Sequence, residues 1–369
     1  ASMPIKSIVA VLSGGPSDQA SLAMAYNVAK DFDSHIDGPL IAFTLGDING
    51  VGPETLALAI NEQSLRRKFL PVIYGDPTVF QAACRLVGMP SPDIETVSGP
   101  GAVRDSKSLA FIESARGVPH RRPGTLDPEA GRCAMEWLAA AVDAATEGLV
   151  DAIVTCPINK EGIHLAGYTC RGHTDFIAER TKSPAYRMAL FAGAMRAVHH
   201  TDHISLRRAL ECVTKESIVE TIRITHAGLL RLGIERPRVA VAGLNPHAGE
   251  NGAFGAEEIQ VIAPAIQECF RDGIDCSGPY PADTVFRRMR DGAFDVVVAM
   301  YHDQGHGPMK LFAMDEGVNV TLGIPIVRTS PDHGTAYDIA GTGTAREHSL
   351  VAACRLAVRL SRGASGMGA

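Results

Sequence analysis

Short apolar runs alternate with amphipathic stretches along the chain, and this alternation limits the fold more than any other feature. Apolar residues recur at intervals of three and four in Arg132–Glu147 and Thr214–Leu232, which predicts helices. Thr214 suits an N-cap, whereas Ser217 is a poor partner for a capping box. The alternation is typical of an α/β fold with a largely parallel core sheet. The runs predicted as strands are Leu40–Leu45, Val72–Tyr74, Ala152–Thr155, Val239–Ala242 and Val296–Met300.

Composition excludes several classes of protein. The 369 residues are 46% hydrophobic and 21% charged, enough for two lobes with a buried core. The net charge of −6 leaves no basic face for nucleic acid. No apolar run reaches the ~18 residues of a membrane helix, and the start lacks a signal-peptide pattern. The 8 cysteines are scattered without a CxxC pair, so we expect reduced thiols and a cytoplasmic protein without membrane contact.

The first 38 residues differ from the rest of the chain. Ile5–Leu12 is a strand pattern, Ser13–Ser17 a loop and Gln19–Phe32 a helix pattern. This stretch resembles the opening unit of a universal stress protein, cut off before its second strand. Because one such unit cannot bury its own apolar face, it must pack on the body or stay loosely ordered. We treat residues 1–38 as an extension, either native or fused, and assign it no function.

Polar and glycine-rich clusters come directly after the predicted strands. Since the carboxyl ends of parallel strands meet at one edge of a sheet, we expect these clusters to converge. The first cluster, Gly46–Glu54, has Pro53 near a helix start. It is therefore either a tight turn or a loop whose N–H groups face an anion. The clusters are Gly46–Glu54, Thr155–Lys160 with Gly172–Asp175, His199–Arg207, Gly243–Glu250 and Met300–His306.

Several of the 13 histidines lie in these clusters beside Asp, Asn and Gly. A lone histidine there is usually a surface or hydrogen-bonding residue. Several at converging strand ends can instead hold zinc or a similar divalent ion, with positions left for substrate oxygens. Their wide spacing excludes a zinc finger, and spacing alone does not say which are ligands. Downstream, Lys310 and Arg328 are either solvated cations or a pair that holds a phosphate or carboxylate.

The motifs GHTD, NPHAGE, MYHDQG, VNVTLG and DHGTA..DIAGTG carry a family resemblance. From about Leu40 to the C-terminus, the chain resembles the 4-hydroxythreonine-4-phosphate dehydrogenases of pyridoxal phosphate biosynthesis. The resemblance implies an isocitrate/isopropylmalate dehydrogenase-like fold, with two α/β lobes around an active-site cleft. It implies a cofactor-side lobe of residues 39–152 with 320–369, and a lobe of residues 153–319 for metal, substrate and dimerisation. Enzymes of this fold bind NAD without a G-x-G-x-x-G motif, which agrees with the absence of that motif from this chain.

The resemblance also assigns residues by their match to these motifs. It implies three metal ligands, a substrate-binding set and, from the wider fold, a cofactor-side loop. It further implies a homodimer whose active site takes residues from both subunits. The metal ligands are His203, His247 and His302; the substrate residues are His173, Thr174, Lys310, Asn319 and Arg328; the cofactor-side residues are Asp338 and Gly341.

The reaction implied is oxidation followed by decarboxylation. A divalent ion (Zn, Mg, Mn or Co) would lower the pKa of the substrate hydroxyl and orient its C–H toward NAD. Hydride transfer gives a ketone beside the carbon that bears the carboxylate, and the ion stabilises the enolate as CO2 leaves. The sequence does not identify the proton acceptor, for which Lys310 is a candidate.

Two departures bear on the substrate. The opening loop has Ile48-Asn49 where the family usually has Pro-Ala. The segments PINKEGIHLAG, NPHAGENGAFG and YHDQGHGPMK are closer to a branch that acts on 4-phosphorylated threonate or erythronate and yields dihydroxyacetone phosphate. Two other hypotheses stay open: a metal-dependent hydrolase or lyase without NAD, and a catalytically silent binding protein. The DHGTA..DIAG segment argues against the hydrolase, which needs no dinucleotide loop.

Overall fold

The structure is a computed structural model, which describes residues 38–62, 65, 68–105, 108–113, 117–313 and 316–365. The strand, loop and helix predicted within Ile5–Phe32 lie outside these residues.

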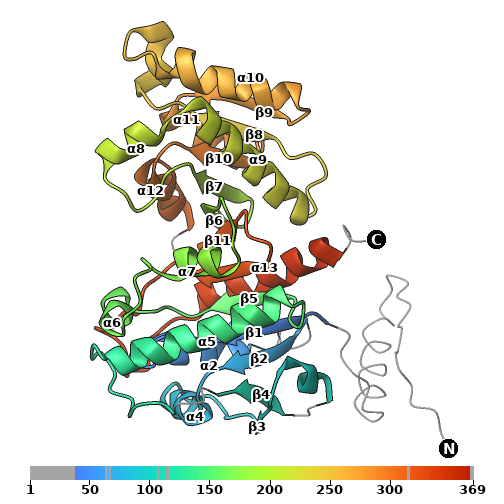
Figure 1. Ribbon diagram of the computed structural model, residues 1–369, viewed down its shortest axis with the longest axis vertical. Helices are drawn as coiled ribbons and strands as arrows, with labels where there is room; N and C mark the ends of the chain where they lie inside the picture. The colour runs from blue at the N-terminus through green and yellow to red at the C-terminus, as the bar shows by residue number, and fades with distance from the viewer. Residues whose placement is uncertain are drawn as a thin grey trace, which may run out of the picture.

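Twelve described strands form one sheet that runs along the longest axis of the molecule, with β3 and β9 at its two ends (Figure 1). Their order is β3-β4-β2-β1-β5-β12-β11-β6-β7-β10-β8-β9. The strands are β1 (Leu40–Thr44), β2 (Leu70–Tyr74), β3 (Ile94–Thr96), β4 (Leu109–Ile112), β5 (Ala152–Thr155), β6 (Arg187–Ala192), β7 (Met195–His199), β8 (Val239–Ala242), β9 (Cys276–Tyr280), β10 (Val296–Ala299), β11 (Val318–Leu322) and β12 (Arg328–Pro331).

The sheet is largely parallel, as predicted, and its antiparallel pairs are grouped in the middle. The antiparallel neighbours among the described strands are β12–β11, β11–β6 and β6–β7. Strands β5, β8 and β10 are buried along their whole length, because helices cover both faces of a parallel sheet. That coverage explains why these strands are continuous apolar runs in the sequence.

Helices pack on the sheet in groups. In one half, α5 contacts α6 and α7, while α13 contacts α2; in the other half, α9 packs on α10, and α12 lies against β7 and β10. Among the described residues, no helix is both long and apolar enough to cross a bilayer. The helices are α2 (Gly52–Asn61), α4 (Pro77–Leu86), α5 (Pro128–Thr146), α6 (Lys160–Leu165), α7 (His173–Arg180), α8 (Leu206–Cys212), α9 (Lys215–Arg231), α10 (Ala263–Arg271), α11 (Ala282–Arg290), α12 (His302–Ala313) and α13 (His348–Ser365), with the shorter η1 (Pro100–Asp105), η2 (Pro246–Gly252) and η3 (Glu258–Ile262).

One local prediction was wrong. Ser217 does complete a capping box at the start of α9, because its hydroxyl accepts from the Thr214 N–H at 3.1 Å while Thr214 Oγ1 accepts from the Ser217 N–H at 3.3 Å. A serine side chain is shorter than the usual Glu or Gln partner, yet it reaches the N-cap nitrogen here.

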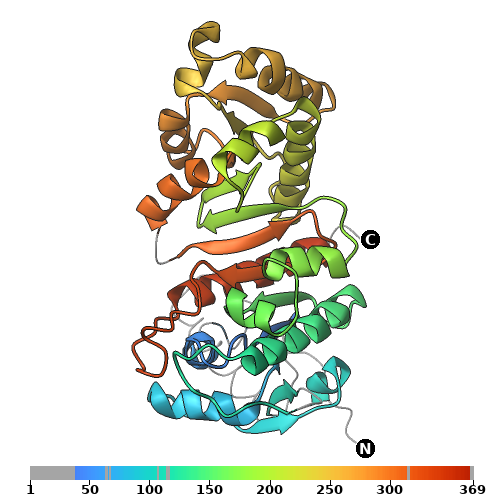
Figure 2. The same cartoon turned by 60° about the vertical axis from the view of Figure 1, so that its left-hand side comes forward.

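The chain forms two α/β halves that share the sheet (Figure 2). Strands β1 to β5 with β12 and α13 make one half, and β6 to β11 make the other. The α/β fold predicted from the sequence is confirmed; the lobe boundaries at residues 152/153 and 319/320 stay a prediction. The antiparallel strands in the middle bring the ends of β5 and β12 close to β11 and β6, and the candidate site lies there.

Candidate active site

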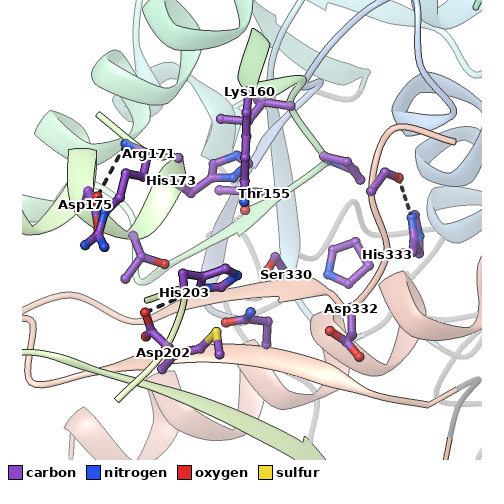
Figure 3. A pocket seen from close by; sticks show the side chains of 18 of the residues that line it. Thr155, Lys160, Arg171, His173, Asp175, Asp202, His203, Ser330, Asp332 and His333 are labelled. Atoms are coloured by element: carbon purple, nitrogen blue, oxygen red, sulfur yellow. Dashed lines mark hydrogen bonds and ion pairs between the residues drawn. The ribbon is translucent and has the colours of Figure 1, made fainter. Parts of the chain in front are cut away.

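A cavity of about 490 Å³ opens where the two halves meet. Its walls come from β5, β6, β11 and β12, from the start of α7 and from one side of α12. In Figure 3, Lys160 and His173 lie on one side of it, and His203 and Asp332 on the other. The predicted site residues that line it are His173, Thr174, His203, His302, Lys310, Asn319 and Arg328.

Arg328 gives the cavity its main positive charge. Arg328 is 3% exposed. Its guanidinium donates to Thr155 Oγ1 at 2.7 and 3.2 Å and to Thr321 Oγ1 at 3.4 Å. No carboxylate among the described residues pairs with it. Burial lowers its pKa to about 9, so it still carries its charge at neutral pH. A buried cation without a counter-ion is costly, which makes this position suited to an anionic ligand.

Three buried polar atoms around the cavity have no partner among the described residues. They are His173 Nε2, Asn319 Oδ1 and His333 Nε2. Burial, followed by the positive charges of Arg328 and Lys160, holds the pKa of His173 well below its ordinary value, so its imidazole is neutral. Buried polar groups are nearly always hydrogen-bonded in proteins. Unpartnered atoms around one cavity therefore indicate a polar ligand that supplies the missing bonds.

His203 and His302 lie together at the cavity, with ring centroids 5.4 Å apart. A neighbouring carboxylate contacts Nδ1 of each: Asp202 Oδ1 lies 3.4 Å from that of His203, and Asp303 Oδ1 lies 2.7 Å from that of His302. The carboxylates thus occupy Nδ1 and leave Nε2 of both rings for a ligand. A carboxylate on one ring nitrogen is the usual support for a metal-binding histidine. His203 has a φ of 40°, in the left-handed region that few non-glycine residues adopt.

His247 lies apart from this pair. It begins a run of five residues, through Asn251, with φ between 44° and 80°, a left-handed turn after β8. Its ring lies 6.3 Å from that of Phe254, and it does not line the cavity. Among the described residues, no three His, Cys, Asp or Glu side chains gather as a metal site. One chain thus brings together two of the three predicted ligands.

The carboxylate of Glu258 supports this left-handed turn. It is 3% exposed and accepts from the N–H groups of Leu244 at 2.8 Å and Asn245 at 2.7 Å, and from Asn245 Nδ2 at 2.9 Å. Burial works to raise the pKa of Glu258, but the hydrogen bonds from Asn245 and Leu244 outweigh it and hold the pKa below its usual value. The His247 turn is therefore a fixed feature of the chain.

One face of α12 carries His302, His306 and Lys310, at successive intervals of four residues. The His302 and His306 rings stack with centroids 4.0 Å apart. His306 Nδ1 lies 3.0 Å from His199 Nε2, and Lys310 Nζ lies 3.0 Å from Asp332 Oδ2. Burial first, then the charge of His306, lowers the pKa of His199 to about 3, so that ring stays neutral.

The chain is similar to known proteins in sequence and in architecture. Residues 67–357 match the family described as "Pyridoxal phosphate biosynthetic protein PdxA". The chain belongs to the PdxA family. A D-threonate 4-phosphate dehydrogenase of Cupriavidus necator is 42% identical over 88% of this chain and 97% of its own. A 4-hydroxythreonine-4-phosphate dehydrogenase of Desulfosudis oleivorans is 44% identical over 87% of this chain and 95% of its own. The crystal structure of the 4-hydroxythreonine-4-phosphate dehydrogenase from Klebsiella pneumoniae matches with a TM-score of 0.80 and 39% identity, covering 88% of this chain and 98% of that one.

The two cofactor-side residues predicted for this PdxA family member lie outside the cavity lining. Asp338 and Gly341 belong to a turn after β12. The Gly341 N–H donates to Glu54 Oε1 at 2.7 Å, so its hydrogen bond is already made within the chain. The glycine loop before α2 is likewise a tight turn, because its N–H groups donate to protein oxygens: Asn49 to Asp47, and Val51 to Thr335.

Several cavity residues have no function predicted from the sequence. Asp332 and Lys160 lay in segments already singled out, and the i, i+4, i+8 spacing of His302, His306 and Lys310 could have indicated a shared helix face. Ser330 and Met188 carried no sequence signal. His200 lies elsewhere: its ring nitrogens contact Thr221 Oγ1 at 2.9 Å and the Cys212 carbonyl at 3.1 Å, which is a structural role.

Proposed function

We propose that this PdxA family member catalyses the NAD-dependent, divalent-metal-dependent oxidation and decarboxylation of a 4-phosphorylated 3-hydroxy acid. The observation that carries the proposal is the buried Arg328, which pairs with no carboxylate among the described residues, in the same cavity as the His203–His302 pair. A phosphorylated acid supplies the anion that Arg328 lacks, and its hydroxyl supplies an oxygen for a metal beside the histidines. The family's dehydrogenase names support a nicotinamide cofactor as the hydride acceptor.

The residues present fit a divalent metal. Nδ1 of His203 and of His302 each contacts a carboxylate, so Nε2 of both rings is left for an ion. When bound, Zn, Mg, Mn or Co would act as a Lewis acid on the substrate hydroxyl and on the ketone formed from it. We assign the third ligand to His247 of the partner subunit in a homodimer. The apolar surface beside the pair supports this: Leu206 and Leu210 are 56% and 49% exposed, and Phe254, next to His247, is 54% exposed.

The chain's own residues bind and orient the substrate. Arg328 neutralises a substrate anion, while His173 Nε2 and Asn319 Oδ1 take the hydrogen bonds that the protein leaves unmade. Thr174, at the start of α7, lies on the same wall. The turn that carries Asp338 and Gly341 stands on the cofactor side, where we expect NAD to approach.

Charge pairing inside the cavity favours a substrate with a hydroxyl at C2, next to the C3 hydroxyl that is oxidised, over a substrate with an amine at C2. Asp175 is held by Arg171 at 2.6 and 3.1 Å and by Tyr186 Oη at 2.9 Å. Asp202 contacts His203, and Asp332 pairs with Lys310. Each carboxylate among the described lining residues thus already has a partner, and a substrate ammonium group would find none free. A hydroxyl needs only neutral partners, so 4-phospho-D-threonate and 4-phospho-D-erythronate, which would yield dihydroxyacetone phosphate, fit better than 4-phosphohydroxy-L-threonine.

A substrate panel tests both parts of the proposal. Purified protein with a divalent metal and NAD is mixed with each of the three phosphorylated acids, and NADH absorbance and dihydroxyacetone phosphate are measured over time. We expect the highest kcat/KM with a 2-hydroxy acid. A preference for 4-phosphohydroxy-L-threonine would overturn the charge-pairing argument. Release of inorganic phosphate without NAD, and no NADH from any substrate, would favour a hydrolase instead.

A further inference from the structure

Among the described residues, the neighbour that anchors Lys310 in the cavity is Asp332. Its Nζ lies 3.0 Å from Asp332 Oδ2 and donates to the Asp332 backbone carbonyl at 3.4 Å. Asp332 is itself fixed, because its N–H donates to Ser349 Oγ at 3.0 Å, and that hydroxyl donates to the Gly317 carbonyl at 2.6 Å. The Lys310 side chain is 42% exposed and that of Asp332 is 13% exposed. The amine is therefore held at one position while it keeps access to water.

The ion pair decides which way a proton can move at Lys310. The Lys310 ammonium lies 3.0 Å from the Asp332 carboxylate and carries N–H donors but no acceptor, so it is not placed to take the substrate's hydroxyl proton. Burial works to raise the pKa of Asp332, but the contacts with His306 and Lys310 outweigh it and hold the pKa below its usual value, which keeps the carboxylate charged. Lys310 is arranged to donate a proton.

Three other proton-bearing groups of the cavity, Arg328, Tyr186 and Lys160, are less suited to that step. Arg328 does not release its proton in ordinary protein chemistry. Tyr186 already donates to Asp175, and burial, followed by this hydrogen bond, raises its pKa. Lys160 has no ion-pair partner among the described residues and lies on the opposite wall, beside His173. Lys310 combines a fixed position with a transferable proton on the same helix face as His302.

We propose that Lys310 is the acid that protonates the substrate carbon from which CO2 leaves, and that Asp332 is the residue that positions it. This inference rests on the proposed oxidation and decarboxylation. When the C1–C2 bond of the keto acid breaks, CO2 departs and the bonding pair forms the C2=C3 bond of an enolate, with the negative charge on the C3 oxygen. The C2=C3 pair then takes a proton from the Lys310 ammonium, the C3 ketone re-forms, and the neutral amine regains a proton from water.

Isotope exchange on the product isolates this step from hydride transfer. Dihydroxyacetone phosphate in D2O, with the protein, Mg²⁺ and NADH, should exchange a hydrogen at its hydroxymethyl carbon, because the protonation runs in reverse. Replacing Lys310 with Met should slow this exchange by about 10²–10⁴-fold, the usual contribution of a general acid. Asp332→Asn should lower kcat and exchange together with little change in KM, and Asp332→Glu should recover part of the loss. Lys68→Gln, an exposed lysine outside the cavity, is the matched control.

Forward turnover in D2O gives a second readout. The wild-type product should carry deuterium in one of the two positions of that carbon, as read by triosephosphate isomerase, which removes only one of the two hydrogens. An enolate released from the Lys310→Met protein would pick up deuterium equally in both positions. Wild-type exchange rates or one-sided labelling in that variant would overturn the assignment of Lys310. Absence of NADH from the wild-type protein with every substrate would instead remove the proposed function.

Discussion

The carboxylate of Glu54 lies 2.7 Å from the Gly341 nitrogen, and it joins the start of α2 to the turn after β12. The same Oε1 atom accepts from Arg121 at 2.9 Å, and Oε2 accepts from the Gly343 N–H at 3.3 Å. Glu54 is fully buried, so three segments distant in sequence depend on one charge. The turn proposed for the cofactor side is therefore built on a buried ion pair.

Glu54→Gln should destabilise the protein. It removes the charge that pairs with Arg121, whose side chain is 13% exposed, and it places an amide N–H₂ against backbone donors. Breaking a buried pair typically costs about 3–5 kcal/mol of unfolding free energy. Urea unfolding measures the effect. Glu211→Gln, which breaks the exposed pair with Arg208, is the control and should cost less than about 1 kcal/mol. Equal losses in the two variants would contradict the role given to Glu54.

Arg328→Met should separate stability from activity. Because the guanidinium is buried and the described part of the chain offers it no counter-ion, its removal should leave the unfolding free energy unchanged or raise it by about 1 kcal/mol. Loss of the anion contact should lower kcat/KM, and the fall should correspond to about 2–5 kcal/mol of lost transition-state stabilisation. Thermal unfolding and steady-state kinetics test the two halves. Arg187→Met, which removes a cation paired with Glu220 at 2.9 Å, should lower stability instead. A large stability loss with unchanged kcat/KM for Arg328→Met would count against this account.

His200 should make the protein less stable in acid. Burial lowers its pKa to about 4, while an unfolded chain has a value near 6.5. Between these values the unfolded chain binds the extra proton, so stability is full above pH 6.5 and falls as the pH drops toward 4. The total is on the order of 3 kcal/mol. Urea unfolding at pH 7, 6, 5 and 4.5 should give a flatter pH profile for His200→Gln than for wild type. Parallel profiles would show that His200 does not contribute.

The sequence predicts the scaffold better than the partnerships within the site. Buried parallel strands such as Ala152–Thr155 and Val239–Ala242 were predicted at their observed bounds, because continuous apolar runs reflect burial on both faces. Convergence of strand ends anticipates that His173 and His302 share a cavity, and the family resemblance adds Arg328 to them, although their roles stay predictions. The Lys310–Asp332 pair could not be foreseen, since it depends on how α12 approaches the end of β12.

Sequence reasoning was least informative about His247. The motif match predicts that His247 is a metal ligand. It does not predict whether His247 would bind the metal in its own chain or in the site of a second chain. In one chain, the left-handed turn held by Glu258 keeps it away from His203 and His302. In the proposed homodimer, its position relative to the second chain would depend on an interface that no strand or helix pattern encodes.

Mixing two inactive variants tests whether the metal set spans two subunits. His247→Ala and His302→Ala should each abolish activity and weaken metal binding, because each removes one proposed ligand from every site. In a mixed dimer, one site combines an intact His203–His302 pair with an intact His247 of the partner subunit, and the other site lacks both. Random exchange makes half the dimers mixed, so an equal mixture should recover about a quarter of wild-type activity.

A mixture of His203→Ala with His302→Ala is the control and should recover none, because both residues lie in the same chain's cavity. No recovery in the first mixture, despite demonstrated subunit exchange, would mean that His247 does not act across the interface.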